Sequence, residues 1–343
     1  MKKHLIAAAA LIATTGAWAQ STVTLYGALD ASVAYIKNAA PGQSATYVND
    51  SAIQSSLWGL KGSEDLGNGM KANFNLQGDV NMGTGAANAE FFRREANVSL
   101  VDADYGELRV GRTLSPAYVN SQGGVILPGN SIGVTSALAM GYAADIFTRN
   151  AITYYSPVMS GVKATVQYAA GERAGTTANS ARKTAFSLTY ADGPARAGLA
   201  GEEVLGLDGK TTRRHYNVNG QYSLGDIKLG GGLYWVHKGA SASGNADTAQ
   251  GKLSSHGVIL SAGYQFDPAL IAAVTYNSNS LGSKLLNVTV RQALSKRTTV
   301  YALLGQADNS TKDVKFTALW GDNTTAVYNS KQTALALGMI HAF

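Results

Sequence analysis

Few residues of this chain are arranged for covalent or metal-dependent chemistry. The chain contains no cysteine, which excludes a disulfide framework, a thiolate metal site and a cysteine nucleophile. Five histidines are scattered along it, and none has the spacing of a metal-ligand motif: His4, His215, His237, His256 and His341. The sequence therefore predicts no metal and no cofactor.

One short segment has the spacing of a hydrolase nucleophile elbow, Gly129-Asn130-Ser131-Ile132-Gly133. That motif requires a strand before the serine and a helix after it. Here Pro128 precedes the segment, and residues rich in glycine, serine and alanine surround it. We interpret the match as chance and expect no enzyme. A lipase that carries a Ser/His pair on a membrane barrel is the formal alternative.

The remaining candidates for chemistry are basic side chains at alternate positions. Lys71, Lys163, Lys183, Lys228 and Arg291 each lie on the polar side of a segment in which polar and apolar residues alternate. A period of two indicates a β-strand with two different faces. Such cations cannot catalyse a reaction by themselves, but together they can attract dissolved anions to one face of a sheet.

The same alternation recurs along most of the chain, and no segment has a comparable period of 3.6 residues. No run of about 18 apolar residues is present, which excludes a helical membrane protein. Compact turn signals occur at 67–69, 104–106, 160–161, 192–194, 225–226, 267–268 and 295–296. Longer polar segments lie between them, at 38–54, 81–90, 113–149, 171–181, 203–212, 239–252, 277–283 and 308–330. These fifteen connections predict sixteen strands.

Short turns and long loops alternate strictly, so each kind would lie at one end of an up-and-down sheet. Outer-membrane barrels combine short periplasmic turns, long external loops and an even number of strands. The sheet must close, because an open edge in lipid would leave backbone groups unpaired. We therefore predict an all-β protein, a 16-stranded antiparallel transmembrane β-barrel with a water-filled lumen. A soluble β-sandwich is the alternative.

The two ends of the chain agree with this location. Residues 1–19 combine a positive start, a short apolar run and Ala17-Trp18-Ala19, which is typical of a secretory signal peptide. We expect its removal to leave a single barrel domain over 20–343 and to lower the net charge from +6 to +4. So mild a charge argues against a nucleic-acid partner. The last strand ends on Phe343, which we interpret as a signal for the barrel assembly machinery.

Several motifs resemble the general trimeric porins of Gram-negative β-proteobacteria. They are Ser21 to Gly27, Trp58 to Gly67 with Gly69, Gly106 to Arg112, Ala151 to Pro157, Ser295 to Thr298 and His341 to Phe343. The resemblance implies a homotrimer with one pore per subunit and an inward-folded third external loop. The segment 113–149 is the third long connection and the longest one. It contains Asp145 as its only acidic residue, which should weaken any preference for cations.

The resemblance also implies arginines on the barrel wall. Arg94 matches the wall arginine that follows the second external loop, although it shares a face with apolar residues; Arg93 is the alternative. Leu57 stands where the family usually has arginine, but Lys61 lies on the same face. We further expect Arg149 and Arg109 to face the lumen. Arg112 shares the face of Leu108 and Val110, so we assign it to a subunit contact.

Together these observations predict an outer-membrane porin for passive diffusion of inorganic ions and small hydrophilic solutes. We expect it to favour anions mildly and to lie, as a homotrimer, in the lipid of a Gram-negative outer membrane. A substrate-specific channel on the same barrel is the closest alternative, because such pores use aromatic tracks or ladders of charge. Most tyrosines here share the apolar face, which favours the general channel.

Overall fold

The computed structural model describes residues 22–87, 89–129, 146–171, 182–206, 212–237, 254–309, 317–319 and 329–343. Within these residues one sheet contains 17 strand segments, all paired in antiparallel fashion. The strands are β1 (Thr22–Ala40), β2 (Gln43–Asp50), β3 (Leu57–Gly67), β4 (Met70–Asp79), β5 (Glu95–Asp102), β6 (Gly106–Leu114), β7 (Phe147–Tyr155), β8 (Val162–Ala169), β9 (Lys183–Asp192), β10 (Ala195–Leu205), β11 (Thr212–Leu224), β12 (Ile227–His237), β13 (Ser255–Gln265), β14 (Leu270–Asn279), β15 (Lys284–Ala293), β16 (Thr298–Asn309) and β17 (Ser330–Ala342).

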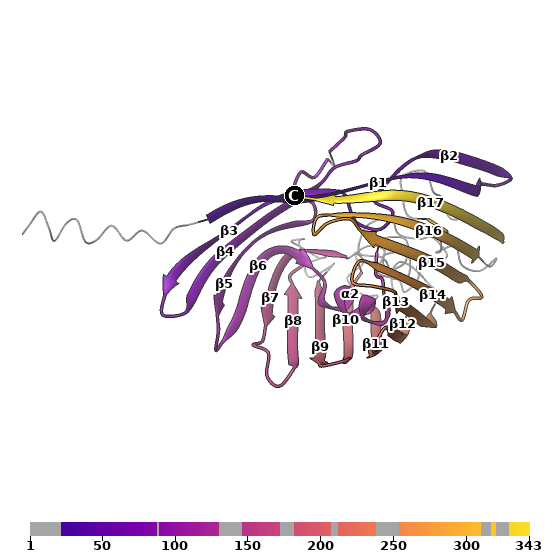
Figure 1. Cartoon of the computed structure of the whole chain (residues 1–343). Coiled ribbons are helices and arrows are strands. Elements are labelled where there is room, and N and C mark those ends of the chain that lie inside the picture. The colour runs from indigo at the N-terminus through magenta and orange to yellow at the C-terminus, as the bar shows by residue number, and fades with distance from the viewer. Residues whose placement is uncertain are drawn as a thin grey trace, which may run out of the picture.

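The sheet closes on itself where the two ends of the described chain meet, so that indigo β1 lies beside yellow β17 (Figure 1). On its other side β1 pairs with β2 along its second half and with β3 along its first half. Two segments thus share one place in the ring, and the 17 described segments occupy sixteen positions. Reciprocal backbone hydrogen bonds of 3.1 Å between Gly27 and Phe343 complete the closure. The predicted 16-stranded barrel is confirmed, and a sandwich is excluded.

The seven short turns lie where the sequence predicts them. For example, β11 ends at Leu224 and β12 begins at Ile227, and β3 and β4 are joined across Asn68. Asn68, Gly67 and Gly69 all have positive φ angles, a conformation that glycine and asparagine adopt more readily than other residues. Tight turns at one end of every hairpin fix the strand register.

The predicted loop over 38–54 is wrong. β1 continues to Ala40, turns at Pro41–Gly42 with Gly42 at φ 72°, and returns as β2. Small and polar residues suggested a loop here, but this part of the chain forms a backbone-paired hairpin whose outward side chains include Val33, Tyr35 and Val48. The true interruption is the segment 51–56 between β2 and β3. β10 and β14 also extend into the predicted loops 203–212 and 277–283, as far as Leu205 and Asn279.

The two faces of the barrel wall differ as the alternation predicts. On β11 the outward Val218 is 49% exposed, whereas the inward Asn217 is 3% exposed. Lys163, Lys183 and Arg291 lie on the inner face, as predicted: their side chains contact Tyr155, Glu202 and the carbonyl of Pro128. A lysine or arginine that faced lipid at the midplane would cost about 2–4 kcal/mol of stability, and the inward orientation avoids this cost.

The chain between β6 and β7 begins with a short helix, α2 (Pro116–Ser121), and a 3-10 turn, η1 (Gln122–Gly124). The helix α2 packs against β9, β10 and β11, and Figure 1 draws it inside the sheet beside β10. Its Asn120 bonds to Asn217 at 2.6 Å, Val125 accepts from Gln221 at 2.8 Å, and Ile126 donates to Ser261 at 3.1 Å. Residues 115–129 therefore line the inner wall. No helix of the described residues is long and apolar enough to cross a membrane.

Candidate functional site

A cavity of about 630 Å³ lies where the segment 115–129 approaches the opposite wall. One side is formed by residues 51–56 and by the end of β4, and the other by α2, η1 and Phe147. Pro128 and Gly129 lie between the two sides. Since these segments come from distant parts of the chain, only the closed barrel brings them together.

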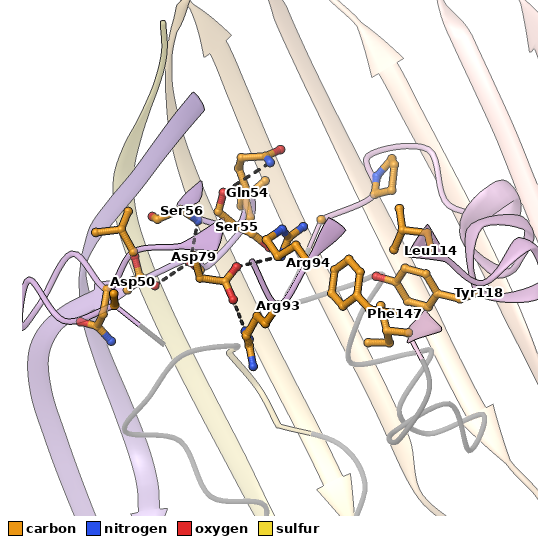
Figure 2. Close-up of a pocket in the computed structure, with 18 of the residues that line it drawn as sticks. Asp50, Gln54, Ser55, Ser56, Asp79, Arg93, Arg94, Leu114, Tyr118 and Phe147 are labelled. Carbon is orange, nitrogen blue, oxygen red and sulfur yellow. Dashed lines mark hydrogen bonds and ion pairs between the residues drawn. The ribbon is translucent and has the colours of Figure 1, made fainter. Parts of the chain in front are cut away.

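Two arginines and one carboxylate form the charged centre of this cavity. Arg94 Nη1 lies 3.1 Å from Asp79 Oδ1, and Arg93 pairs with the other oxygen of the same carboxylate. Figure 2 shows both guanidinium groups directed at Asp79. Arg94 Nε also donates to Gln77 Oε1 at 2.8 Å. One carboxylate thus orients two cations and neutralises only one of them.

Arg94 is also held by aromatic rings. Its guanidinium lies 4.8 Å from the centre of the Phe147 ring, and Tyr118 of α2 lies beside both (Figure 2). Burial raises the pKa of Tyr118 to about 12, against a smaller opposing effect of Arg94. The phenol is therefore neutral at physiological pH and does not offset the positive charge of the neighbouring Arg94.

The facing side of the cavity carries neutral donors and one further carboxylate. Gln54, Ser55 and Ser56 line it together with Asp50. The Asp50 carboxylate already accepts from the hydroxyl of Ser51 at 2.6 Å and from the backbone of Met82 at 3.2 Å. Counted by side chains, the described lining is close to electroneutral, with its two arginines set against two aspartates.

Sequence analysis predicted both Arg93 and Arg94 for this place, as alternatives. The structure brings both to the cavity, because they precede β5 and are not subject to its alternation. That they constrict a pore stays a prediction. Leu57, which replaces an expected arginine, is buried and lies opposite Asp79 in the strand register.

Lys61 and Arg109 lie on the wall outside this cavity. The Lys61 ammonium is 5.0 Å from the centre of the Tyr26 ring. Arg109 lies 2.8 Å from Glu107 and 3.8 Å from Glu95, and its guanidinium is 4.9 Å from the centre of the Tyr155 ring. Both cations are thus on the inner face, but Arg109 is already balanced by two carboxylates.

Arg149 and Arg112 meet at Glu90 instead of at the cavity. Arg112 lies 3.2 Å from one Glu90 oxygen, and Arg149 pairs with the other. A bulge between Gly111 and Thr113 shifts the register of β6, and Gly111 has φ 127°. The simple alternation that assigned Arg112 to a subunit contact therefore ends before it. A role for Arg112 between subunits, like a lumen role for Arg149, stays a prediction.

Three other predictions fall partly or wholly outside the described residues. Asp145 lies there, as do residues 130–133 of the apparent nucleophile elbow and the predicted signal peptide 1–19. Among the described residues no group of three His, Cys, Asp or Glu side chains could hold a metal ion. The closed barrel, its inner cavity and its apolar outer face together define a membrane channel.

Comparisons with known proteins identify the kind of channel. A sequence model described as Gram-negative porin matches residues 7–312. The chain is 32% identical to the outer membrane porin protein 32 of Delftia acidovorans, with each protein covered over its whole length. It is 30% identical to an outer membrane porin protein of Bordetella pertussis, over 67% of this chain and 68% of that protein.

A solved structure described as an anion-selective porin from Comamonas acidovorans is also similar. It has a TM-score of 0.79 and 26% sequence identity, and the match covers 94% of this chain and all of that one. The chain belongs to the Gram-negative porin family. It is an outer-membrane porin, and the family is one of channels rather than enzymes.

Proposed function

We propose that this porin is a general diffusion channel that favours anions mildly over cations. The observation that carries the proposal is the position of Arg93 and Arg94 in a cavity inside the wall, with one carboxylate between them. Solutes that pass this cavity would meet two guanidinium groups that share Asp79 on one side, and neutral donors with Asp50 on the other. Among the described residues that line it, the arrangement does not resemble a closed binding site for one solute.

The size of the preference is limited by the charges themselves. Two unit charges 4 Å apart interact by about 1 kcal/mol in water, and a tenfold effect requires about 1.4 kcal/mol. Asp50 and Asp79 offset much of the positive charge of the cavity. A bias of a few-fold for anions is therefore expected, and strict selection of one ion is not.

Similarity supports the sign of this preference. The structure from Comamonas acidovorans is described as an anion-selective porin, and its fold matches this chain over 94% of its length. The loop carboxylate Asp145, the only acidic residue over 113–149, is too little to reverse the sign. We propose no enzymatic activity and no cofactor.

We also propose that the chain acts as a homotrimer. Its insertion into the membrane would depend on recognition of the C-terminal Phe343 by the barrel assembly machinery. An apolar groove on the outer wall supports a protein contact there. It is lined by Val23, Phe74, Val98, Leu100, Leu108 and Val110 and has a volume of about 500 Å³. Exposed apolar patches of this kind mark contacts with membrane or with another protein.

Single-channel recording in a planar bilayer tests the proposal. Purified protein should insert in groups of three equal current steps, and the current should rise linearly with salt. Vesicles containing it should swell in small neutral sugars without saturation. Saturation by one class of solute would instead support the substrate-specific alternative, and absence of current steps would contradict both.

A further inference from the structure

The interruption between β2 and β3 is the part of the wall that projects into the cavity. Residues 51–56 fold against the inner side of β1, where Ala52 and Ile53 are buried. Asp30 of β1 accepts several hydrogen bonds from their backbone. The amide groups of Ile53 and Gln54 both donate to Asp30 Oδ2, at 2.7 Å each.

Asp30 also binds this segment through its backbone. The amide of Ser51 donates to the Asp30 carbonyl at 3.0 Å, and the Asp30 amide donates to the hydroxyl of Ser56 at 3.0 Å. Asp30 itself has no exposed surface. A carboxylate so placed is stable only with its donors in position, because burying it unpaired is costly. The segment and the carboxylate therefore fix one another.

The second oxygen of Asp30 is held from two strands away. The hydroxyl of Tyr301, on β16, donates to Asp30 Oδ1 at 2.6 Å. To reach β1 the tyrosine ring crosses β17 at Gly338, its partner in the strand register. A Cβ atom at Gly338 would overlap the ring, so glycine at this position opens the path.

Arg291, on β15, lies opposite Tyr301 in the strand register and reaches the other side of the cavity. Its Nη2 donates to the carbonyl of Pro128 at 2.9 Å and lies 3.4 Å from that of Leu127. The next residue, Gly129, touches Ile53: a Cβ atom built on the glycine would lie 2.9 Å from Ile53 Cγ2. The segments 51–56 and 127–129 thus meet above Asp30, Tyr301 and Arg291.

We propose that Asp30, Tyr301 and Arg291 form a positioning cluster that sets the width of the channel and keeps it steady. The cluster does not line the cavity, whereas Ile53 to Ser56, Pro128 and Gly129 do. It therefore acts through those two segments rather than on the solute. The inference rests on the proposed channel function. In it, Arg93 and Arg94 affect which ions pass, whereas the cluster fixes the shape of the channel.

Single-channel recordings of full-length Asp30→Asn and Tyr301→Phe test the cluster. Asparagine keeps the shape of the side chain but loses a charged acceptor. A hydrogen bond to a charged group contributes enough to shift a population about tenfold. The fraction of time spent at altered conductance should therefore rise about tenfold in Asp30→Asn, and less in Tyr301→Phe. Tyr154→Phe is the matched control, because its hydroxyl donates to the backbone carbonyl of Tyr105 at an exposed turn, away from the cluster, and its loss should leave the current steady.

The absence of cysteine allows a test by rescue. The variant Ile53→Cys/Gly129→Cys, which carries the only two thiols, is designed to link the two segments on oxidation. A Cβ atom at position 129 would lie 2.9 Å from the Ile53 carbonyl oxygen, so the reduced cysteine pair without Asp30→Asn is the reference for the effect of the cysteines themselves. Oxidation should restore a steady current to Asp30→Asn, and reduction should abolish the effect. If Asp30→Asn does not fold, the same measurement is made on Tyr301→Phe with the cysteine pair, and oxidation should again restore a steady current.

Three results would overturn the inference. They are Asp30→Asn channels with the conductance and noise of the wild type, Tyr301→Phe channels with the same wild-type behaviour, or a disulfide that forms and leaves the noise of the variant unchanged. A loss of unfolding stability with an unchanged current would show a purely structural cluster. A wild-type protein that forms no channel would contradict the proposed function instead, so the two failures are distinguishable.

Discussion

The guanidinium of Arg94 lies 3.1 Å from the carboxylate of Asp79, which also pairs with Arg93. Two arginines thus share one carboxylate, so the group of three side chains has a net charge of +1, and the carboxylate holds both arginines in place. It also means that the arginine and the aspartate should influence ion flow in opposite directions.

Removal of the Arg94 charge should weaken the preference for anions. In Arg94→Gln the ratio of anion to cation permeability should fall, by less than about tenfold, because one charge near a wet path contributes about 1 kcal/mol. The reversal potential in a salt gradient measures this ratio. Lys296→Gln is the control, since it removes the same charge from an exposed turn. An equal fall in both variants would exclude a local role for Arg94.

Removal of the Asp79 charge should have the opposite effect. Asp79→Asn leaves both arginines in the cavity without their shared counter-charge, so the permeability ratio should rise. The rise should shrink in 1 M salt, where the screening length is about 3 Å. An unchanged ratio at low salt would mean that solutes do not pass this cavity.

The closed sheet predicts which positions tolerate a cation. Leu233→Arg places a guanidinium on the lipid face of β12, where Leu233 is exposed, and should cost about 2–4 kcal/mol of unfolding free energy. Lys228→Arg keeps a cation on the inner face of the same strand and should cost little. Urea unfolding from lipid vesicles measures both. Equal costs would contradict the assignment of the two faces.

Much of this arrangement could be predicted from the sequence because the membrane enforces it. Lipid favours apolar residues at outward positions, so the alternation along β8 and β11 can be recognised in the sequence. The tight turns between strands can be recognised from their glycine, asparagine and aspartate residues. The hairpin of β1 and β2 keeps outward apolar residues, but small and polar residues surround its turn at Pro41–Gly42, and the loop predicted over 38–54 from those residues is wrong. The alternation also fails at Arg112, where the bulge at Gly111 changes the register.

The pairing inside the cavity could not be predicted for a different reason. Asp79 stands at a polar position of its strand, but its meeting with Arg93 and Arg94 depends on the path of the chain between β4 and β5. Asp30 likewise is one more polar residue in an alternating strand. Its donors, Ile53 and Tyr301, are 23 and 271 residues away. Only a register between distant strands could have identified these contacts.

The terminal aromatic residue should matter more in cells than in a test tube. Phe343→Ala should reduce the amount of protein in the outer membrane if assembly machinery reads this residue. Folding of the purified variant into vesicles should be nearly normal, because the backbone bonds between Gly27 and Phe343 do not need the ring. Heat-modified migration on gels measures both. Equal loss in cells and in vesicles would indicate a structural role only.

The sign of the wild-type reversal potential tests the central claim most directly. In a planar bilayer with a roughly tenfold gradient of potassium chloride, the zero-current potential should have the sign set by chloride and remain well below its Nernst limit. It should approach zero as the salt concentration is raised on both sides, because the charges of the cavity are screened. A potential with the sign set by potassium would contradict the role assigned to Arg93 and Arg94.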